Sequence, residues 1–330
     1  MNDAPWKTRK VVIVGAGAVG STFAYALGQS GLADEIALLD PNRDLAMGQV
    51  LDLAHGQAFF PAVQIRVAET SDYADEQLIV ITAGSKQRPD ESRLDLLQRN
   101  IKIINGIIDE IVRQKSSAVV LMASNPVDIL TYAASKRAGW PRGRIIGSGT
   151  VLDSARFRYL LSRHCGVDVH NVHAYILGEH GDSEFASWSM TNIAGQPIQQ
   201  FCGLCHACDD AEAARRSIAD EVVHSAYHII EFKGATSFGI GLALTSIAAA
   251  ILRNQHGVLT VSTVLEGEFG IEGVSLGVPC IVSQNGVERV LPVTLPPDEQ
   301  SSLEKSTAIL KEGIAQLELG DNSVAAVGKL

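Results

Sequence analysis

Three side chains in the second half of the sequence are of types that together perform acid–base chemistry. His180 lies in the glycine-flanked turn Gly178-Glu179-His180-Gly181-Asp182 after an expected strand, a place where an imidazole is exposed and held in position. Asp153 and Arg156 are three residues apart in an expected helix over 151–165, so they project from one face. They could form a local ion pair worth only about 0.2–0.5 kcal/mol. Alternatively, Asp153 orients His180 and Arg156 binds a substrate carboxylate through two hydrogen bonds. The spacing does not distinguish these interpretations.

A glycine-rich segment near the N-terminus predicts a dinucleotide site. Gly15-Ala16-Gly17-Ala18-Val19-Gly20 follows the β-branched run 10–14, which is typical of a buried strand, and precedes an expected helix over 21–30 that Gly31 would end. In such a segment the first glycine allows a tight turn, the second lets the backbone approach a pyrophosphate, and the third lets helix and strand pack closely. N–H groups at the helix N-terminus then bind the phosphates.

An acidic residue completes this pattern and indicates which dinucleotide is bound. Asp40 ends a second apolar run, 35–39, and lies 20 residues after the last glycine of the segment. Its carboxylate would accept hydrogen bonds from a ribose diol and repel a 2′-phosphate, and Pro41 beside it brings no compensating cation. The sequence therefore predicts NAD rather than NADP as the cofactor.

The elements that must hold these residues alternate between strand and helix in the first half of the chain. Further expected strands are 78–83, 118–123 and 144–147, and expected helices are 46–55 and 94–113. This alternation predicts an α/β fold with a doubly wound parallel sheet, whose ligands bind at the carboxyl ends of the strands. Gly84 and Asn125 lie at such ends, and the polar segment 85–92 is expected to be an exposed, mobile loop.

The sequence is expected to divide into two domains near Gly149. A chain of 330 residues is too long for one typical core. Residues 1–149 are expected to form an NAD-binding Rossmann domain, and residues 150–330 an α+β substrate domain. Expected elements of the second part are the strand 172–177, helices over 210–233 and 239–253, short strands within 258–294, and a last helix after Pro296-Pro297.

Composition and charge argue against several classes of partner. With 46% apolar residues the chain should be globular, and its net charge of −10 argues against nucleic acid or an anionic membrane as a partner. Residues 1–10 contain no apolar signal region, and the longest apolar stretches are too short to cross a membrane. The C-terminal Gly-Lys-Leu is not the peroxisomal tripeptide. We therefore expect a cytoplasmic protein with reduced cysteines.

Five blocks of the sequence together resemble the L-lactate dehydrogenase family of the bacterial type. They are the segments 15–20, 87–93, 125–128 (Asn-Pro-Val-Asp), 151–156 (Val-Leu-Asp-Ser-Ala-Arg) and 178–184. Their order and spacing are specific, and they extend over nearly the whole chain. The resemblance implies NADH-dependent, reversible reduction of pyruvate to L-lactate. It also implies a homotetramer, which composition alone does not indicate.

The resemblance implies a role for each matching residue of the catalytic machinery. His180 matches the proton donor and acceptor, Asp153 its orienting partner, and Arg156 the arginine that binds the substrate carboxylate. Arg93 matches the mobile-loop arginine that polarises the ketone, and Gln87 the residue that reads the group on C2 of the 2-keto acid. Gln87 and Arg93 are six residues apart, which is the family spacing without a gap.

The resemblance also places contacts to substrate and cofactor. Further expected substrate contacts are Asn125, Asp128 and Thr236. Expected cofactor contacts are Gly15, Gly17, Val19, Gly20, Asp40, Gly84, Ser85, Ser124, Asn125 and Ser148. No metal site is implied.

A pair of basic residues suggests an effector site. Arg156 and Arg158 are two residues apart on a helix, about 200° around its axis, so they point to nearly opposite sides. In the resembling bacterial enzymes, an arginine and a histidine at the positions of Arg158 and His173 bind fructose 1,6-bisphosphate where subunits meet. Symmetry-related pairs would form a basic pocket for a bisphosphate, although the same residues could merely pair with acids at an interface.

Other functions on the same fold remain open. A malate dehydrogenase would need a cation at position 87 to pair with a second substrate carboxylate, and Gln87 argues against it, although Arg88 is adjacent. A dehydrogenase of branched 2-hydroxy acids is also possible, because one sequence does not reveal the volume of a pocket.

Functions of other classes have weaker support. NAD-dependent glycosidases resemble the chain at the nucleotide motif but carry a cysteine before Asn-Pro, where Ser124 stands here. A non-catalytic NAD-sensing protein would not need His180, Asp153, Arg156 and Arg93 together. Cys202-Gly203-Leu204-Cys205-His206 matches a c-type haem attachment motif, but haem attachment expects an exported chain, so ordinary loop cysteines are expected.

Overall fold

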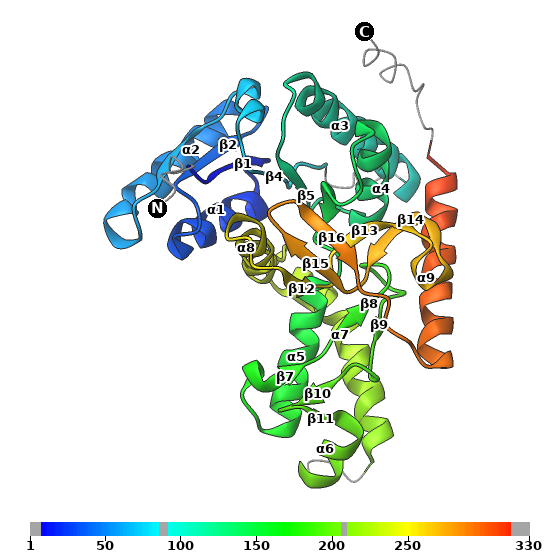
Figure 1. Cartoon of the computed structure of the whole chain (residues 1–330). Helices are drawn as coiled ribbons and strands as arrows, with labels where there is room; N and C mark the ends of the chain where they lie inside the picture. Colours follow the sequence, from blue (N-terminus) through cyan, green and yellow to red (C-terminus); the bar gives the residue numbers. More distant parts are fainter. Residues whose placement is uncertain (1–7, 86–91, 206–209, 318–330) are drawn as a thin grey trace, which may run out of the picture.

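A mostly parallel sheet of eight strands forms the centre of the molecule, in the order β14-β13-β6-β5-β4-β1-β2-β3 (Figure 1). The structure is a computed structural model that describes residues 8–85, 92–205 and 210–317. The parallel strands are β1 (Lys10–Val14), β2 (Glu35–Leu39), β3 (Gln64–Val67), β4 (Leu78–Ile81), β5 (Val119–Met122) and β6 (Ile145–Gly147). Their order across the sheet, 3-2-1-4-5-6, is that of a doubly wound dinucleotide-binding fold, so the predicted fold class is confirmed.

The register of the parallel strands brings their carboxyl ends to one edge of the sheet. Val14 of β1 pairs with Leu39 of β2 on one side and with Ile81 of β4 on the other. Met122 of β5 pairs in turn with Ile81 and with Gly147 of β6. Strands β4 and β5 are buried along their whole length, which explains why they read as continuous apolar runs without alternation.

The α-helices that connect the parallel strands are α1 (Ala18–Ser30), α2 (Arg43–His55), α3 (Arg93–Arg113) and α4 (Val127–Ala138). Helix α1 begins earlier than expected because Gly17 is its N-cap, and it ends at Gly31, whose φ of 62° is the left-handed cap that the sequence predicts. Helix α4 was not predicted, because it is buried on most sides and lacks a clear apolar stripe.

The second half of the chain begins with α5 (Val151–Cys165), which has the predicted bounds. The expectation of one strand over 172–177 is wrong. The backbone forms two short strands there, β7 (Val172–His173) and β8 (Ile176–Leu177), because each pairs with a different partner. Strand β7 pairs with β10 (Asn192–Ile193), which also pairs with β11 (Gln196–Pro197), whereas β8 pairs with β9 (Phe185–Ala186).

The remaining α-helices and the second sheet occupy the centre, the lower part and the right side of the molecule in Figure 1. The helices are α6 (Ile198–Cys205), α7 (Ala211–Lys233), α8 (Phe238–Leu252) and α9 (Pro297–Ala315). A separate antiparallel sheet contains β12 (Gly257–Leu259), β15 (Cys280–Ser283) and β16 (Gly286–Val290). Short 3-10 helices are η1 (Gln57–Phe59), η2 (Thr70–Ala74), η3 (Val169–Asn171) and η4 (Glu268–Gly270). Among the described residues, no helix is both long enough and apolar enough to cross a membrane.

Two strands from the second half extend the Rossmann sheet beyond β6. Strands β13 (Ser262–Glu266) and β14 (Glu272–Gly277) pair with each other in antiparallel fashion, and β13 also pairs with β6 where Ser262 faces Gly147. The approach is close: a Cβ on Gly147 would lie 2.5 Å from Thr131 Oγ1 and 2.9 Å from Ser262 Cβ. The sheet is therefore shared by the two halves of the chain, which the sequence did not indicate.

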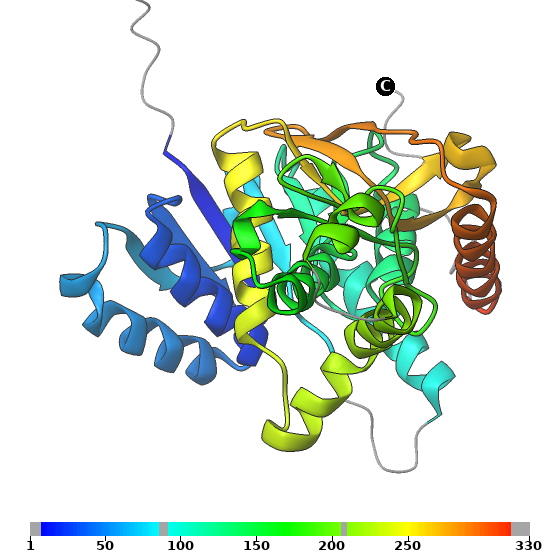
Figure 2. The ribbon, with the colours of Figure 1, turned by 90° about the horizontal axis from the view of Figure 1, so that it is seen from below.

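Helix α8 packs beside α1, as both views show (Figures 1 and 2). Gly241 permits this contact, because a Cβ at that position would lie 2.9 Å from Thr22 Cγ2. The nucleotide-binding helix is thus held between its own sheet and an element from the second half of the chain.

Candidate active site

The glycine-rich loop after β1 has the conformation that a pyrophosphate requires. Gly15 has a φ of +107°, and a Cβ there would lie 2.8 Å from the Ala83 nitrogen. A Cβ on Gly20 would lie 1.9 Å from the Gly15 oxygen, so only glycine lets α1 pack this closely. A Cβ on Gly17 would have open space around it, and α1 has no side-chain cap at that end. The loop therefore leaves backbone N–H groups accessible to a phosphate, and the residues present fit a dinucleotide.

Asp40 lies beside this loop at the end of β2. Its Oδ2 accepts a hydrogen bond from the Ala16 nitrogen at 2.8 Å, and its Oδ1 accepts one from the Asn42 nitrogen at 2.8 Å. These bonds fix the carboxylate next to the phosphate-binding turn, where the ribose of a bound dinucleotide would reach it. The expected role of Asp40 in cofactor choice stays a prediction.

The other expected cofactor residues follow the neighbouring strands along the same edge. Gly84 and Ser85 follow β4, Ser124 and Asn125 follow β5, Ser148 follows β6, and Val19 lies half-buried in the first turn of α1.

A buried side chain that the sequence analysis missed connects two of these strand ends. Asn100 of α3 accepts a hydrogen bond from the Ser85 nitrogen at 2.9 Å and donates one to the Asn125 oxygen at 3.2 Å. It lies in the middle of an ordinary amphipathic stripe, and the only available signal was an amide on the buried face.

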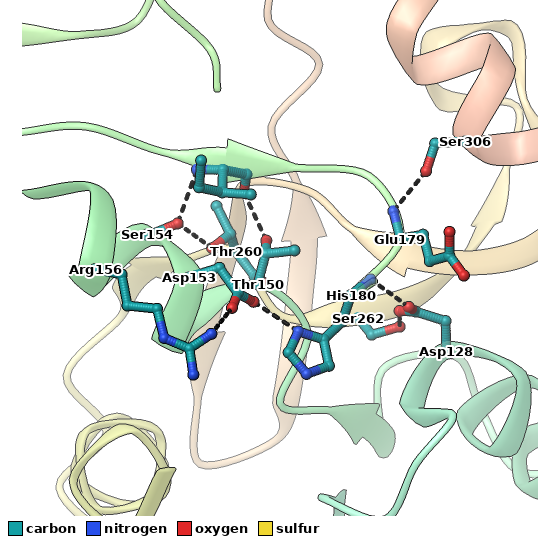
Figure 3. A network of polar contacts seen from close by, with 11 residues as sticks. Asp128, Thr150, Asp153, Ser154, Arg156, Glu179, His180, Thr260, Ser262 and Ser306 are labelled. Carbon is teal, nitrogen blue, oxygen red and sulfur yellow. Dashed lines mark hydrogen bonds and ion pairs between the residues drawn. The ribbon is translucent and has the colours of Figure 1, made fainter. Parts of the chain in front are cut away.

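His180, Asp153 and Arg156 lie together, as Figure 3 shows. Asp153 is central: its Oδ2 accepts a hydrogen bond from His180 Nδ1 at 2.6 Å, and its Oδ1 accepts one from Arg156 Nη1 at 2.6 Å. Its side chain is 1% exposed, whereas the His180 side chain is 25% exposed. The two interpretations of the Asp153–Arg156 spacing are therefore compatible, since the ion pair and the contact with His180 exist together.

The charges of this group favour an imidazolium. Burial alone would lower the pKa of His180, but the charge of Asp153 and its hydrogen bond, with smaller effects of the Glu184 and Asp128 charges, outweigh burial and raise that pKa to about 9. For Asp153, burial favours the neutral acid, but the positive charges of His180 and Arg156 prevail and its pKa lies below the ordinary value. The ring nitrogen that does not contact Asp153, Nε2, is the one that can exchange a proton with a ligand.

Buried hydroxyl groups hold α5 against the strand that leads to His180 (Figure 3). Ser154 Oγ accepts a hydrogen bond from the Ile176 nitrogen at 2.9 Å, and Thr150 Oγ1 donates one to the Ile176 oxygen at 2.6 Å. Thr260 Oγ1 lies 3.1 Å from Ser154 Oγ. These contacts fix the separation of Asp153 on α5 from His180 after β8, and nothing in the sequence pattern indicated them.

Asp128 lies behind the turn that carries His180 (Figure 3). It is 2% exposed, and its Oδ2 accepts a hydrogen bond from the His180 backbone nitrogen at 2.7 Å. Its Oδ1 accepts one from Ser262 Oγ at 2.5 Å. Burial raises the pKa of Asp128 to about 6, against the opposing effect of these two hydrogen bonds. Asp128 therefore holds the turn that carries His180, and the expected substrate contact at Asp128 stays a prediction.

Several expected residues are placed less completely. Gln87 lies outside the described residues, as does the side chain of Arg93, whose backbone begins α3. Thr236 is half-buried in the segment between α7 and α8. The side chains of Cys202 and Cys205 and all of Cys208 also lie outside the described part of the chain.

The expected effector residues lie on two elements that are in contact, α5 and β7. Arg158 is half-buried, and its Nε donates a hydrogen bond to the Ser154 oxygen at 3.3 Å. His173 is exposed on β7.

A doubly wound sheet with this glycine loop fits a dinucleotide, and the His180–Asp153 pair can supply the proton that accompanies hydride transfer. By class, the molecule is an NAD-dependent dehydrogenase. Family models for the lactate/malate dehydrogenases match residues 9–147 (NAD-binding domain) and residues 150–319 (α/β C-terminal domain). The chain belongs to the lactate/malate dehydrogenase family, which confirms the predicted relationship and NAD as the cofactor.

Individual relatives agree over almost their whole length. The chain is 58% identical to an L-lactate dehydrogenase of Treponema denticola, over 94% of this chain and 99% of that protein. It is 46% identical to L-lactate dehydrogenase 1 of Clostridium acetobutylicum, over 93% and 98% of the two chains. A crystal structure of the minor L-lactate dehydrogenase from Enterococcus mundtii in its ligands-bound form is similar with a TM-score of 0.92 and 41% identity, over 95% of this chain and 100% of that one.

We expect Asp40 to make the protein prefer NADH over NADPH by about 10²-fold in kcat/KM, because placing like charges together costs a few kcal/mol. Rates with the two cofactors at saturating 2-keto acid measure this directly. Asp40→Asn is the matched control, since it removes the charge and keeps one oxygen acceptor, for the nitrogen of either Ala16 or Asn42, and it should narrow the preference for NADH. Equal efficiencies with both cofactors in the parent would contradict the assignment.

Proposed function

We propose that this protein catalyses the reversible reduction of pyruvate to L-lactate with NADH. The observation that carries the proposal is the contact of His180 Nδ1 with buried Asp153, which leaves Nε2 for proton transfer. The relatives described above are L-lactate dehydrogenases, which favours this substrate over other 2-keto acids.

In this proposal His180 acts as the general acid. When bound, NADH supplies the hydride that reduces the ketone carbon. His180, as imidazolium, gives its Nε2 proton to the ketone oxygen, and in the reverse direction neutral His180 takes that proton back. Asp153 holds the ring in one orientation and stabilises its charged form.

Arginines supply the remaining charge in the proposed mechanism. Arg156 donates one hydrogen bond to Asp153, and a guanidinium has five N–H donors, so Arg156 can also bind the substrate carboxylate. Arg93 would place positive charge where the ketone oxygen gains negative charge. Asn125 and Thr236 would complete the substrate contacts, and Gln87 would read the group on C2. These roles rest on the family resemblance.

The test of this proposal is NADH oxidation with pyruvate, oxaloacetate and 2-ketoisocaproate side by side. Pyruvate should be the best substrate. Preference for oxaloacetate would instead favour a malate dehydrogenase, and preference for 2-ketoisocaproate a branched 2-hydroxy acid dehydrogenase.

Gln87→Arg should move the ratio of kcat/KM for oxaloacetate to that for pyruvate upward by about 10²-fold or more, because a buried charge pair is worth a few kcal/mol. Pyruvate turnover should fall as well, since pyruvate leaves the new cation without a partner. Arg88→Gln is the control, because it removes the adjacent cation and should leave the ratio unchanged. If the ratio of kcat/KM for the two substrates is the same in Gln87→Arg as in the parent, position 87 does not determine substrate preference.

We also propose that Arg158 and His173 bind fructose 1,6-bisphosphate where subunits meet. The contact between α5 and β7 supports this, as does the orientation of Arg158 away from the Asp153 side of α5. We further propose that the protein forms a homotetramer, that it is located in the cytoplasm, and that its domain boundary lies between residues 149 and 150.

At low protein concentration, fructose 1,6-bisphosphate should lower the KM for pyruvate by about fivefold or more, the usual range of allosteric coupling. The pyruvate saturation curve with and without the effector measures this in the parent and in the double variant Arg158→Gln, His173→Gln, which should not respond. Arg163→Gln, an exposed arginine of the same helix, is the matched control and should respond as the parent does. Superimposed curves in the parent would remove the effector site and leave the catalytic proposal standing.

A further inference from the structure

A third titratable group lies beside His180 and Asp153. Glu184 follows His180 by four residues and directly precedes β9. The nitrogen and carboxylate oxygen atoms that Asp153, His180 and Glu184 offer all lie within 4.8 Å of one another. The proposed proton transfer uses His180 and Asp153 only, so the presence of a second carboxyl group at this distance needs a physical reason.

Two carboxyl groups this close do not both ionise readily, because the second negative charge would be placed against the first. Burial, followed by the charge of Asp153, raises the pKa of Glu184 well above the ordinary value, and a hydrogen bond with Asp153 acts in the same direction. The positive charges of His180 and Arg156 oppose this rise. Those same two charges lower the pKa of Asp153. Asp153 is therefore the carboxyl group that ionises more readily, and Glu184 the one that keeps its proton more readily.

On its other side Glu184 borders a cavity that contains further charged groups. Glu184 lines a cavity of about 440 Å³ whose walls come from β9, α7 and α9. Charged groups on these walls are Arg216 and Asp220 from α7 and Asp298 and Glu299 from α9. Arg216, Asp220 and Asp298 are exposed, so water screens their charges from Glu184.

Glu299 is the most buried of these wall residues, at 6% exposure. Its Oε2 accepts hydrogen bonds from Ser187 Oγ at 2.8 Å and Ser189 Oγ at 2.7 Å. These serines hold the Glu299 carboxylate in place.

We propose that Glu184 is a positioning residue that keeps its proton throughout the reaction and donates a hydrogen bond to Asp153. The carboxylate of Asp153 would then be shared among three donors: His180, Arg156 and Glu184. Neutral Glu184 would add no negative charge beside His180. Because a carboxylate that accepts more hydrogen bonds is less basic, this hydrogen bond would also weaken the stabilisation of the imidazolium by Asp153, and so lower the pKa of His180. That matters most for lactate oxidation, which needs the neutral imidazole. The inference rests on the proposed function, since it concerns the proton of the same histidine.

The experiment compares Glu184→Gln, which mimics the neutral acid, with Glu184→Leu, which has no donor. For each, kcat/KM is measured against pH for pyruvate reduction and lactate oxidation. In the pH profile of pyruvate reduction, the alkaline inflection of the glutamine variant should lie within about 0.3 pH units of the parent's. That of the leucine variant should move upward by about 0.5–1 unit, the scale of one lost hydrogen bond. Lactate oxidation at neutral pH should then fall by about three- to tenfold in the leucine variant only.

Two outcomes would overturn the proposal. A downward shift of the alkaline inflection by one pH unit or more in the glutamine variant would mean that Glu184 is ionised in the parent and stabilises the imidazolium through its negative charge. Superimposed pH profiles in the parent and the leucine variant would mean that Glu184 only fills space. If the leucine variant does not fold, the glutamine variant alone decides between an unchanged and a displaced inflection.

A second readout does not depend on the substrate. Diethyl pyrocarbonate modifies the neutral imidazole, so the pH dependence of His180 modification, followed by peptide mass, reports the His180 pKa in each variant. The His180 pKa measured in this way should shift in each variant by the same amount as the alkaline inflection. If the parent failed to reduce pyruvate but the variants showed these shifts, the catalytic proposal would fail while the role of Glu184 would stand.

Discussion

Turnover of pyruvate is expected to fall by about 10²–10⁴-fold in His180→Asn, the contribution typical of a positioned general acid. Asparagine can still donate a hydrogen bond to Asp153, so the buried carboxylate keeps a partner, but it has no proton to transfer at neutral pH. The cofactor loop lies after β1 and does not depend on this side chain. The Kd for NADH should therefore stay within about twofold of the parent.

Steady-state rates and a fluorescence titration of NADH separate these two effects. His170→Asn is a matched control, because His170 is an exposed histidine in contact with a carboxylate, Asp168, at 2.7 Å and should be replaceable without loss of turnover. Substantial remaining activity in His180→Asn, or loss of NADH binding, would contradict the role assigned to His180.

Asp153→Asn is expected to move the alkaline inflection of pyruvate reduction downward by about two pH units or more. In the parent the His180 pKa is raised to about 9, so the imidazolium is present below that pH and is lost as pH rises through it. Without the charge and hydrogen bond of Asp153, the effect of burial exceeds the smaller opposing effects of the Glu184 and Asp128 charges, so the His180 pKa should fall to about its ordinary value of 6.5. At pH 7.5 the reduction rate should drop by about 10²-fold or more, part of it from lost charge and part from lost orientation of the ring.

The direction of the reaction provides an internal control for Asp153→Asn. Lactate oxidation needs the neutral imidazole, which this variant supplies at lower pH than the parent, so oxidation at neutral pH should suffer less than reduction. Breaking a buried ion pair also costs about 3–5 kcal/mol of stability, so thermal unfolding and NADH affinity must be measured alongside. An unchanged inflection with both rates reduced equally would mean that Asp153 does not set the charge of His180.

The parts of this site that could be predicted from sequence are those that lie within one local pattern. Gly15, Gly20 and Asp40 were predictable because a strand, a turn and a helix in direct succession fix their places. Helix α5 has its predicted bounds because Gly166, with a φ of 66°, ends it in the left-handed conformation. Asp153 and Arg156 were correctly placed on one face of it.

The parts that could not be predicted depend on contacts between distant segments. Asp128 contacts the backbone 52 residues further on, at His180, and Ser262 contacts Asp128 across 134 residues. Periodicity shows which face of an element is buried, but it does not show what lies opposite. The same reason explains why β13 and β14 were not expected in the Rossmann sheet. Glu184 was missed because a charged residue in a loop is ordinarily solvated.

The joining of β13 to β6 has a consequence for the order in which the molecule can form during synthesis. Strand β6 leaves the ribosome well before β13, which follows only after α5, α7, α8 and the strands between them have been made. Until then the β6 side of the parallel sheet is an open edge in a nascent chain, and such edges pair readily with other strands. During this interval Asp128 also lacks the hydrogen bond that Ser262 donates in the complete chain. The nucleotide half is therefore translated first, but its sheet is completed only after β13 and β14 have been made, and a chain released before β13 would expose the β6 edge to pairing with other chains.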